Sequence, residues 1–188
     1  MKYEITNEKK LVNGLTLYRI KALKDFGKVK AGDLGGWIEG ELNLSQEGNA
    51  WVSGDAQVYG KAWVSGDAEV YGKAWVSEDA WVSGDAKVYG NARVFEDAEI
   101  SENAKVYGNA KVYGKAWVYG KALVYGKAFV YGKALVFGNA RVSEDAWVSG
   151  DAKVYGKAWV SGKAWVYGDA KVYGKALVFG DAKVSGKK

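Results

Sequence analysis

The sequence of 188 residues contains no cysteine, no histidine and no proline. Without cysteine the chain has neither a disulfide framework nor a thiolate metal site. Without histidine it has no imidazole to serve as a general base or to activate a serine nucleophile. No run of about 18 apolar residues occurs, so no transmembrane helix is expected. The first residues, MKYEITNEKK, lack the apolar core of a secretory signal. We therefore expect a cytoplasmic protein, with a virion protein as the alternative.

A six-residue repeat fills most of the chain. From Gly48 to Ser185 the sequence reads as 23 consecutive hexads of the form G-x-A-x-V-x, without insertion or deletion. Alanine holds the third position of every hexad, and valine holds the fifth in all but one, which has Ile100. The register continues back to Leu34 in looser form, interrupted by Gln46 and Glu47. A fixed period of this kind indicates a repeat architecture.

Each hexad is predicted to be a short strand followed by a turn. Side chains alternate between the two faces of a strand, so the alanine and the valine share one face. A uniform set of small apolar residues suits a narrow interior, whereas the large or charged residues between them suit a surface. A helix does not fit, because a period of six matches no 3.6-residue stripe and each glycine would cost roughly 1 kcal/mol.

The turn of the hexad requires one residue with positive φ. Glycine adopts that conformation freely and begins 19 of the 23 hexads. Glutamate begins the other four hexads, and the next residue is then always Asp or Asn. Because Asp and Asn visit positive φ more readily than most residues, we expect them to adopt it after Glu78, Glu96, Glu102 and Glu144.

Hexads anchored by valine or isoleucine, with a small residue two positions earlier, resemble those of the hexapeptide-repeat superfamily. The resemblance covers residues 34–185 and implies an all-β, single-stranded, left-handed parallel β-helix. This fold is a triangular solenoid with three hexads per 18-residue coil, which gives about eight coils here. The left-handed sense is implied by the resemblance alone. The stretch Leu17–Ala56, with the skeleton DF…VKAG…GGW…LSQ.G, resembles the start of uncharacterised bacterial and phage hexapeptide proteins that carry a transferase label.

Residues 1–33 are predicted to form a small N-terminal cap, and residues 34–188 the solenoid. In the cap, KKLVNGLTLYRIKAL reads as a hairpin whose Asn13-Gly14 pair suits a type I′ turn. Solenoids need caps because their terminal strands expose unpaired backbone groups. At the other end, Ser185 to Lys188 show no cap. We therefore expect an open edge that favours self-association, partly blunted by the basic tail.

Residues 18 apart are expected to stack about 4.8 Å apart in outward ladders. Stacked rings shield one another and the backbone, yet their edges stay exposed, and large exposed apolar patches mark interfaces. One face should stack Tyr71, Tyr89, Tyr107 and Tyr125; a second should stack Trp147 on Trp165; and a third should stack Trp63 on Trp81 and, further along, Tyr119, Phe137, Tyr155 and Tyr173.

Charge is banded along the predicted solenoid. Residues 48–102 carry four basic and ten acidic residues, a net charge of −6, whereas residues 103–143 carry seven basic residues and no acid. The second stretch, the belt, is either a solvated girdle or a binding site for an anion such as nucleic acid, nucleotide or acidic glycan. The candidate ligand-binding residues are Lys105, Lys111, Lys115, Trp117, Tyr119, Lys121, Tyr125, Lys127, Phe129, Tyr131, Lys133 and Arg141.

The sequence thus predicts a non-enzymatic β-solenoid that acts as a rigid scaffold or protein-interaction module and self-associates, without cofactor, metal or membrane partner. The alternative is an anion-binding protein that uses the belt. Such a protein could be encoded by a phage and directed at a host component. Acyl transfer, the activity of many hexapeptide-repeat proteins, is a remote alternative, because their chemistry typically uses a histidine base that this chain lacks.

Overall fold

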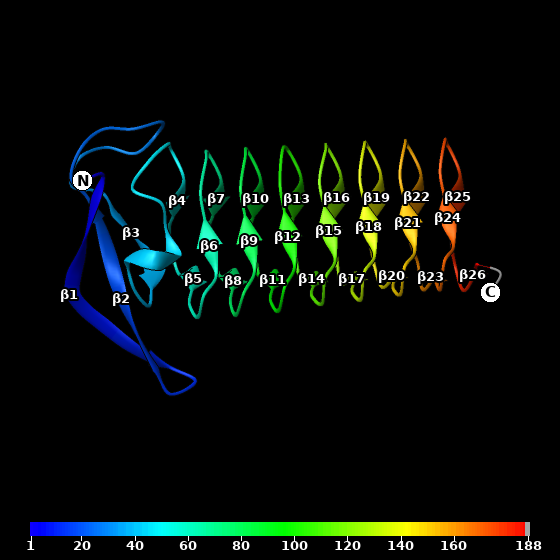
Figure 1. Cartoon of the computed structure of the whole chain (residues 1–188), viewed down its shortest axis with the longest axis horizontal. Coiled ribbons are helices and arrows are strands. Elements are labelled where there is room, and N and C mark those ends of the chain that lie inside the picture. Colours follow the sequence, from blue (N-terminus) through cyan, green and yellow to red (C-terminus); the bar gives the residue numbers. More distant parts are fainter. Residues whose placement is uncertain (187–188) are drawn as a thin grey trace.

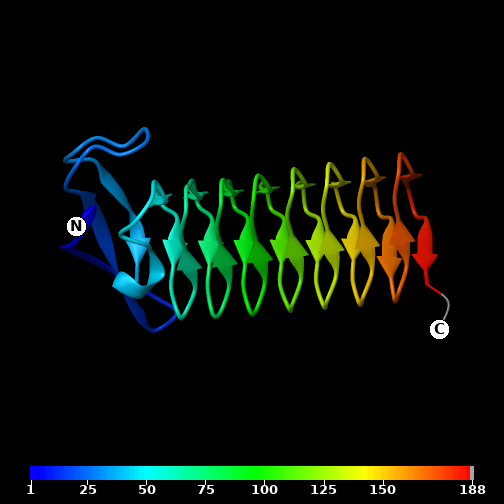
Figure 2. The ribbon, with the colours of Figure 1, turned by 45° about the horizontal axis from the view of Figure 1, so that its top comes forward.

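The hexads fold into a straight solenoid in which each hexad stacks on the third one before it (Figures 1 and 2). The computed structural model describes residues 1–186, so the basic tail at Lys187 and Lys188 lies outside the described residues. Strands 18 residues apart pair in parallel, as Val88 pairs with Val106. The predicted all-β solenoid with 18-residue coils and an N-terminal hairpin is confirmed.

The strands form three long sheets. Sheet I has 11 strands in the order β1 (Tyr3–Val12), β2 (Leu15–Ala22), β3 (Leu34–Ile38), β5 (Gln57–Val58), β8 (Trp75–Val76), β11 (Arg93–Val94), β14 (Lys111–Val112), β17 (Phe129–Val130), β20 (Trp147–Val148), β23 (Trp165–Tyr167) and β26 (Lys183–Ser185). Sheet II has eight strands: β4 (Trp51–Val52), β7 (Glu69–Val70), β10 (Lys87–Val88), β13 (Lys105–Val106), β16 (Leu123–Val124), β19 (Arg141–Val142), β22 (Trp159–Val160) and β25 (Leu177–Val178). Sheet III has seven strands: β6 (Trp63–Val64), β9 (Trp81–Val82), β12 (Glu99–Ile100), β15 (Trp117–Val118), β18 (Leu135–Val136), β21 (Lys153–Val154) and β24 (Lys171–Val172).

The core is the column of alanine and valine side chains. Every repeat alanine and valine from Ala50 to Val166, with Ile100 among them, is fully buried. The residues between them point outward, as the alternation of the strand predicts. Because the column is narrow and close-packed, it is filled by alanine and valine, with Ile100 as the one larger side chain from Ala50 to Val166.

The corners between strands correct one prediction. The glycines that begin the hexads have φ between 63° and 74°, as expected. Where glutamate replaces glycine, the glutamate itself adopts positive φ, between 57° and 61°, and the following Asp or Asn does not. The position in the turn decides the conformation, because each corner is stacked closely on the equivalent corner of the next coil, as Gly60 is on Glu78 and Gly126 on Glu144. In two cases the carboxylate offsets part of the strain: Glu78 Oε2 accepts from Glu96 N at 3.1 Å, and Glu144 Oε2 accepts from Gly162 N at 2.8 Å.

The hairpin of the cap joins the solenoid through β3. Strands β1 and β2 are antiparallel, and Asn13 and Gly14 between them both have positive φ, as a type I′ turn requires. Strand β3 pairs antiparallel with β2 on one side and parallel with β5 on the other. Its residues pair with partners 20 positions later, as Ile38 does with Val58, because Gln46 and Glu47 lengthen the first coil.

Donors from residues 1–47 satisfy the carbonyl groups that the first regular coil turns toward the cap. Lys2 Nζ donates to Ala50 O at 2.8 Å, and Asn43 Nδ2 donates to Ala62 O at 3.0 Å. Asn43 belongs to a short 3-10 helix, η1 (Glu41–Asn43). Gln46, in the two-residue interruption, accepts from Lys2 N at 2.7 Å and so ties β1 to the first coil. These bonds remove the unpaired edge that the first coil would otherwise expose. Within residues 1–186 no helix is long and apolar enough to cross a membrane.

Candidate functional site

The solenoid distributes the twelve belt residues around its circumference. Lys105, Tyr125 and Arg141 lie on sheet II; Lys111, Phe129 and Tyr131 lie on sheet I; Trp117 and Tyr119 lie on sheet III. The remaining four are corner residues, with Lys115 and Lys133 before sheet III, Lys121 before sheet II and Lys127 before sheet I. The belt is therefore a ring around the rod and does not converge on one pocket.

Two belt cations rest on aromatic rings. Lys111 Nζ lies 5.2 Å from the ring centre of Phe129, and the Arg141 guanidinium lies 5.8 Å from that of Trp159. None of the four ion pairs among residues 1–186 involves a belt residue. The belt cations are thus available to an external anion, and two of them have a ring beneath them.

The predicted tyrosine ladder on sheet II is formed. Tyr71, Tyr89, Tyr107 and Tyr125 stack with ring centres 4.8–5.0 Å apart and planes within 4° of parallel. Burial raises the pKa of Tyr107, and its neighbours Tyr89 and Tyr125 raise it further. The Tyr107 hydroxyl therefore stays neutral over the physiological pH range.

On sheet III the predicted stack from Tyr119 to Tyr173 is formed, and sheet I carries a ladder that the prediction missed. The predicted stack of Trp63 on Trp81 is not formed: the two residues are strand partners, but the aromatic contacts of the described residues do not include their rings. Tyr119, Phe137 and Tyr155 stack at 4.9 Å on sheet III, and Tyr173 continues the stack at 5.4 Å. On sheet I, Phe95, Tyr113 and Tyr131 stack at 4.8 and 5.1 Å. The strand pair of Trp147 with Trp165 is present, but the rings meet edge to face at 67° instead of stacking. Trp147 also contacts the rings of Phe129, at 5.1 Å, and Tyr131, at 6.2 Å, and edge-to-face contact is one of the preferred geometries of aromatic pairs.

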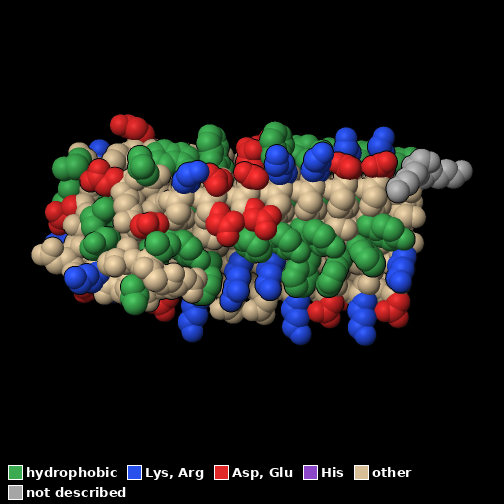
Figure 3. All heavy atoms as spheres, turned by 60° about the horizontal axis from the view of Figure 1, so that its bottom comes forward, with side chains coloured by type: hydrophobic (Ala, Val, Ile, Leu, Met, Phe, Trp, Pro, Cys, Tyr) green, Lys and Arg blue, Asp and Glu red, His purple; other side chains and the backbone are tan. Residues whose placement is uncertain are grey.

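Apolar side chains form a band along the rod with basic side chains beside it (Figure 3). Three tryptophans in the regular coils are well exposed: Trp81 at 55%, Trp117 at 48% and Trp147 at 41%. Two of them, Trp81 and Trp117, lie on sheet III. Exposed aromatic residues of this size are typical of interaction surfaces.

The cap creates two pockets that the sequence did not reveal. The first, of about 520 Å³, lies between the loop at Gly27–Val29 and sheet II. Its carboxylates already have partners: Asp67 Oδ1 accepts from Asn49 Nδ2 at 3.0 Å, and Glu69 Oε1 pairs with Lys87 Nζ at 2.8 Å. The carboxylates of this pocket are therefore largely paired with neighbouring groups of the chain itself.

The second pocket, of about 340 Å³, lies between the hairpin and sheet I and is called the hairpin pocket below. Its cations are Lys10 from β1, Lys73 from a corner and Arg93 from β11. The Arg93 guanidinium lies 4.5 Å from the ring centre of Trp75, another lining residue. Burial lowers the pKa of Lys10, and Arg19 lowers it further, whereas Asp55 opposes both. A bound anion would offset the repulsion between the positive charges of Lys10 and its cationic neighbours.

Buried polar atoms beside the hairpin pocket have no partner within the described residues. They are the indole nitrogen of Trp37 and the side-chain oxygen of Gln57. The two residues are neighbours in the β3–β5 pairing, and Gln57 lines the pocket. Such groups are usually satisfied by water or a ligand. Coil stacking brings Lys73 close to Arg93, but the sequence carries no signal of this pocket, because only the packing of the hairpin adds Lys10 to them.

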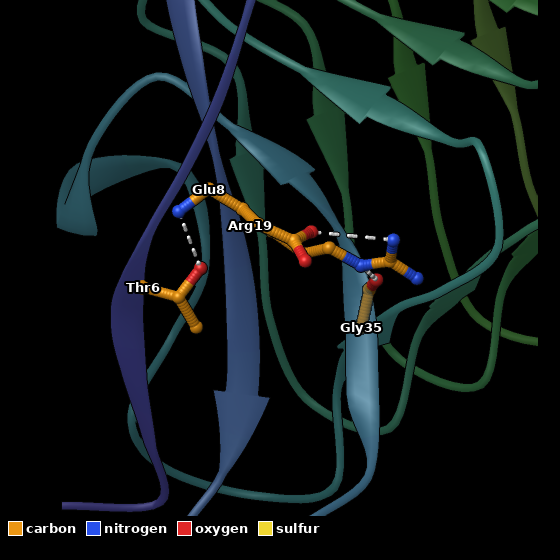
Figure 4. A network of polar contacts seen from close by, with 4 residues as sticks. All are labelled: Thr6, Glu8, Arg19 and Gly35. Atoms are coloured by element: carbon orange, nitrogen blue, oxygen red, sulfur yellow. Dashed lines mark hydrogen bonds and ion pairs between the residues drawn. The ribbon is translucent and has the colours of Figure 1, made fainter.

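A polar network holds the hairpin in place above this pocket (Figure 4). Arg19 Nε donates to Gly35 O at 3.2 Å, and its Nη1 lies 3.4 Å from Glu8 Oε2. The backbone N of Glu8 donates in turn to Thr6 Oγ1 at 3.2 Å. Arg19 thereby links β1, β2 and β3, which fixes the position of Lys10 over sheet I.

The serine hydroxyls of two hexads accept hydrogen bonds from tryptophan side chains. Ser143 Oγ accepts from Trp159 Nε1 at 2.9 Å, and Ser149 Oγ accepts from Trp165 Nε1 at 3.1 Å. Both serines are nearly fully buried. Among residues 1–186, no group of three or more acidic residues is placed to hold a metal ion.

Comparison with known proteins matches the repeats. The family model described as the YdcK β-solenoid repeat matches residues 104–120 and 128–150, which include most of the belt. A curated relative, "Uncharacterized acetyltransferase YdcK" of Escherichia coli (strain K12), is 53% identical over 36 residues. The match covers 19% of this chain and 11% of that relative, so the two share a short stretch of coils. The chain is a β-solenoid protein whose coils are similar to the YdcK β-solenoid repeat.

Proposed function

We propose that this chain is a non-enzymatic scaffold, a solenoid of the left-handed hexapeptide-repeat type that binds protein partners along its sides and self-associates. The observation that carries the proposal is the contrast between a uniform, fully buried interior of alanine and valine and an outer surface rich in exposed aromatic and charged side chains. The uniform interior suits a rigid rod. The exposed aromatic and charged side chains of the exterior suit an interaction surface.

Rigidity is supported by bonds at both strands and corners. Lys87 N donates to Ala104 O at 2.9 Å within a sheet, and Asn91 N donates to Gly108 O at 2.7 Å at a corner. Hydrogen bonds at the strands and at many of the corners therefore hold each coil to the next. A protein built in this way presents residues at fixed positions along an axis, which suits a scaffold.

The absence of catalysis is proposed from the side chains present. Acyl transfer by a serine would need an adjacent base, yet the chain has no histidine, and Ser143 and Ser149 accept bonds from tryptophans. The name of the curated relative makes acetyl transfer the activity to test. Release of free coenzyme A from acetyl-CoA, in the presence of amine and hydroxyl acceptors, should not exceed the rate without protein. A protein-dependent rate would contradict this part of the proposal.

Sedimentation velocity at micromolar concentration tests self-association. We expect a dimer or larger species at low salt that dissociates as salt rises, because the acidic stretch 48–102 and the belt carry opposite charge. A monomer at every concentration and every salt would remove self-association from the proposal.

A second candidate function is the binding of an anionic ligand, and the hairpin pocket favours it. Lys10, Lys73 and Arg93, which form no ion pair within residues 1–186, gather there beside an aromatic ring, whereas the belt cations are spread around the rod. Labelled oligonucleotides and acidic glycans titrated at low and high salt would test it. Changing Lys115, Lys121, Lys127 and Lys133 to Glu should abolish binding at the belt, whereas Arg93→Gln should abolish binding at the pocket. No binding at low salt would exclude both sites.

A further inference from the structure

Sheet III presents three outward rows of side chains, each with one residue per coil. Because the coils are about 4.8 Å apart, the rows run parallel to the rod axis. Over the six coils from β6 to β21, the edge row at the corner before the strands is Lys61, Asp79, Asp97, Lys115, Lys133 and Asp151. The strand row is Trp63, Trp81, Glu99, Trp117, Leu135 and Lys153, and the third row, directly after the strands, is Ser65, Ser83, Ser101, Tyr119, Phe137 and Tyr155.

Two copies of the chain can pack through this face with the rods antiparallel. The two-fold axis then lies between the two sheets and perpendicular to both rods. This operation reverses the direction of the rod but keeps each row at the same lateral position. Each row of one copy therefore faces the same row of the other copy, running in the opposite direction. With the axis between β12 and β15, β12 of one copy faces β15 of the other, β9 faces β18 and β6 faces β21.

The edge row is complementary in charge to its own reverse. Asp97 faces Lys115, Asp79 faces Lys133 and Lys61 faces Asp151, and the symmetry forms each pair twice. All six side chains are exposed. Within one copy, Lys61 Nζ lies 3.5 Å from Asp79 Oδ1, but both side chains are more than half exposed, so exchanging this pair costs little.

The third row is complementary in size to its own reverse. In the N-terminal half it consists of three serines, whose short side chains project less than the rings that continue the row; this low half of the row is called the groove below. In the C-terminal half it is the ladder of Tyr119, Phe137 and Tyr155, a ridge whose rings stack at 4.9 Å. The two-fold places the ridge of each copy in the groove of the other, with Ser83 facing Phe137.

The strand row gains contacts from the same arrangement. Trp81, which is 55% exposed in the single chain, faces Leu135. Lys153 faces Trp63, where its ammonium group can lie on the indole ring. Glu99 faces Trp117, whose indole N–H can donate to the carboxylate. The arrangement thus covers both exposed tryptophans of this face.

The other two sheets fail the same test. With the axis at the equivalent place on sheet I, Arg93 of β11 faces Lys111 of β14. On sheet II, Lys87 faces Lys105, and the rings of Tyr89 and Tyr107 meet ridge against ridge. Like charges placed opposite one another repel, and two ridges cannot interlock. Charge and size select sheet III at this register.

We infer that sheet III is the self-association surface, and that its occupant is a second copy of this chain packed antiparallel about an axis between β12 and β15. The inference rests on the proposed self-association and adds its surface, partner and orientation. The order of acidic and basic residues along the edge row then sets the register of the dimer, because only this register places each acid of the row opposite a base.

Charge reversal in the edge row tests the inference. The basic variant, Asp79→Lys with Asp97→Lys, and the acidic variant, Lys115→Asp with Lys133→Asp, each replace four attractive pairs by repulsive ones. Each variant alone should dimerise about a hundredfold more weakly than the parent chain. Mixed together, the two variants should form a heterodimer of near-parental affinity, because every reversed position then faces its opposite charge. Sedimentation velocity with one variant fluorescently labelled measures both quantities.

A matched control and a size test accompany the charge test. Lys157→Asp with Lys175→Asp changes the net charge as much as the acidic variant does, but at the corner before sheet II, and it should dimerise like the parent chain. Ser83→Tyr should fill the groove and weaken the dimer, and adding Phe137→Ser to it should restore the dimer. Circular dichroism melting confirms that each variant is folded.

The outcomes separate this inference from the proposed function. If the parent chain oligomerises but neither charge variant weakens it, or if the mixture forms no heterodimer, sheet III is not the surface, and the scaffold proposal stands. If the parent chain is monomeric throughout, self-association itself is refuted. If the Lys157/Lys175 control weakens the dimer as much as the acidic variant, general charge and not the edge row drives association, and the inference is overturned.

Discussion

Replacing Gly114 by alanine examines why the corners are glycine, and replacing Gly54 in the same way provides the control. Both residues have positive φ, +74° at Gly114 and +64° at Gly54. A Cβ added at Gly114 would lie 2.8 Å from the backbone N of Gly132 and 2.9 Å from its O, in the next coil. At Gly54 the nearest atom would be 3.3 Å away. The two substitutions therefore share the conformational cost but differ in the clash.

The magnitudes follow from these two terms. An alanine in the left-handed conformation costs roughly 1–2 kcal/mol, and the reduced freedom of its unfolded chain returns about 0.4–1 kcal/mol. Gly54→Ala should thus lower the free energy of unfolding by about 1 kcal/mol. At Gly114 the obstructing atoms are backbone and cannot rotate away, so overpacking adds about 1–3 kcal/mol. Gly114→Ala should lower the free energy of unfolding by about 2–4 kcal/mol.

Urea unfolding followed by tryptophan fluorescence measures both losses, and equal dependence on urea in the parent and variant chains validates the comparison. The clash also pushes against the bond from Lys115 N to Gly132 O, so hydrogen exchange at Lys115 should accelerate in Gly114→Ala. Equal destabilisation by the two substitutions would show that φ alone selects glycine. Close contact between neighbouring coils would then not be a reason for glycine at Gly114.

Three further predictions concern the core, the serine–tryptophan bonds and the cap. Val118→Ala, at a fully buried site in the middle of the rod, should lower the free energy of unfolding by about 2 kcal/mol in urea. Ser143→Ala should lower it by about 1–2 kcal/mol, because it leaves the indole N–H of Trp159 without its acceptor, and a change in the indole proton's NMR shift would report the lost bond. Burial lowers the pKa of Lys2 from 10.5 to about 8, with Glu47 opposing the shift. Since the unfolded chain then binds the extra proton, stability should rise from about pH 8 to about pH 10 in thermal melts. Lys2→Met should abolish that rise, and a rise of equal size in the variant would show that Lys2 is not its source.

The corner glutamates show how far local propensity reaches. The sequence indicated that four corners lack glycine, and propensity favoured the following Asp or Asn as the residue with positive φ. The structure assigns that conformation to Glu78, Glu96, Glu102 and Glu144. Propensity ranks residues in isolation, whereas here the close stacking of each corner on the next coil decides which slot of the turn is left-handed. At Glu78 and Glu144 a carboxylate bond to the next coil offsets part of the cost.

The sequence by itself determined the coil, its period, its inward face, the tyrosine ladder of sheet II and the ladder from Tyr119 to Tyr173 on sheet III, because all of these follow from a repeat in which each position has one environment. It located the belt but placed its residues in one group, and the coil spreads them over three faces. Only the tertiary structure decided the hairpin pocket, since Lys10 meets Lys73 and Arg93 through the packing of the cap on sheet I. It also decided which rows share a face and an orientation. The reversed charge and size of Asp97 and Lys115, and of Ser83 and Phe137, acquire meaning when two whole sheets are brought together.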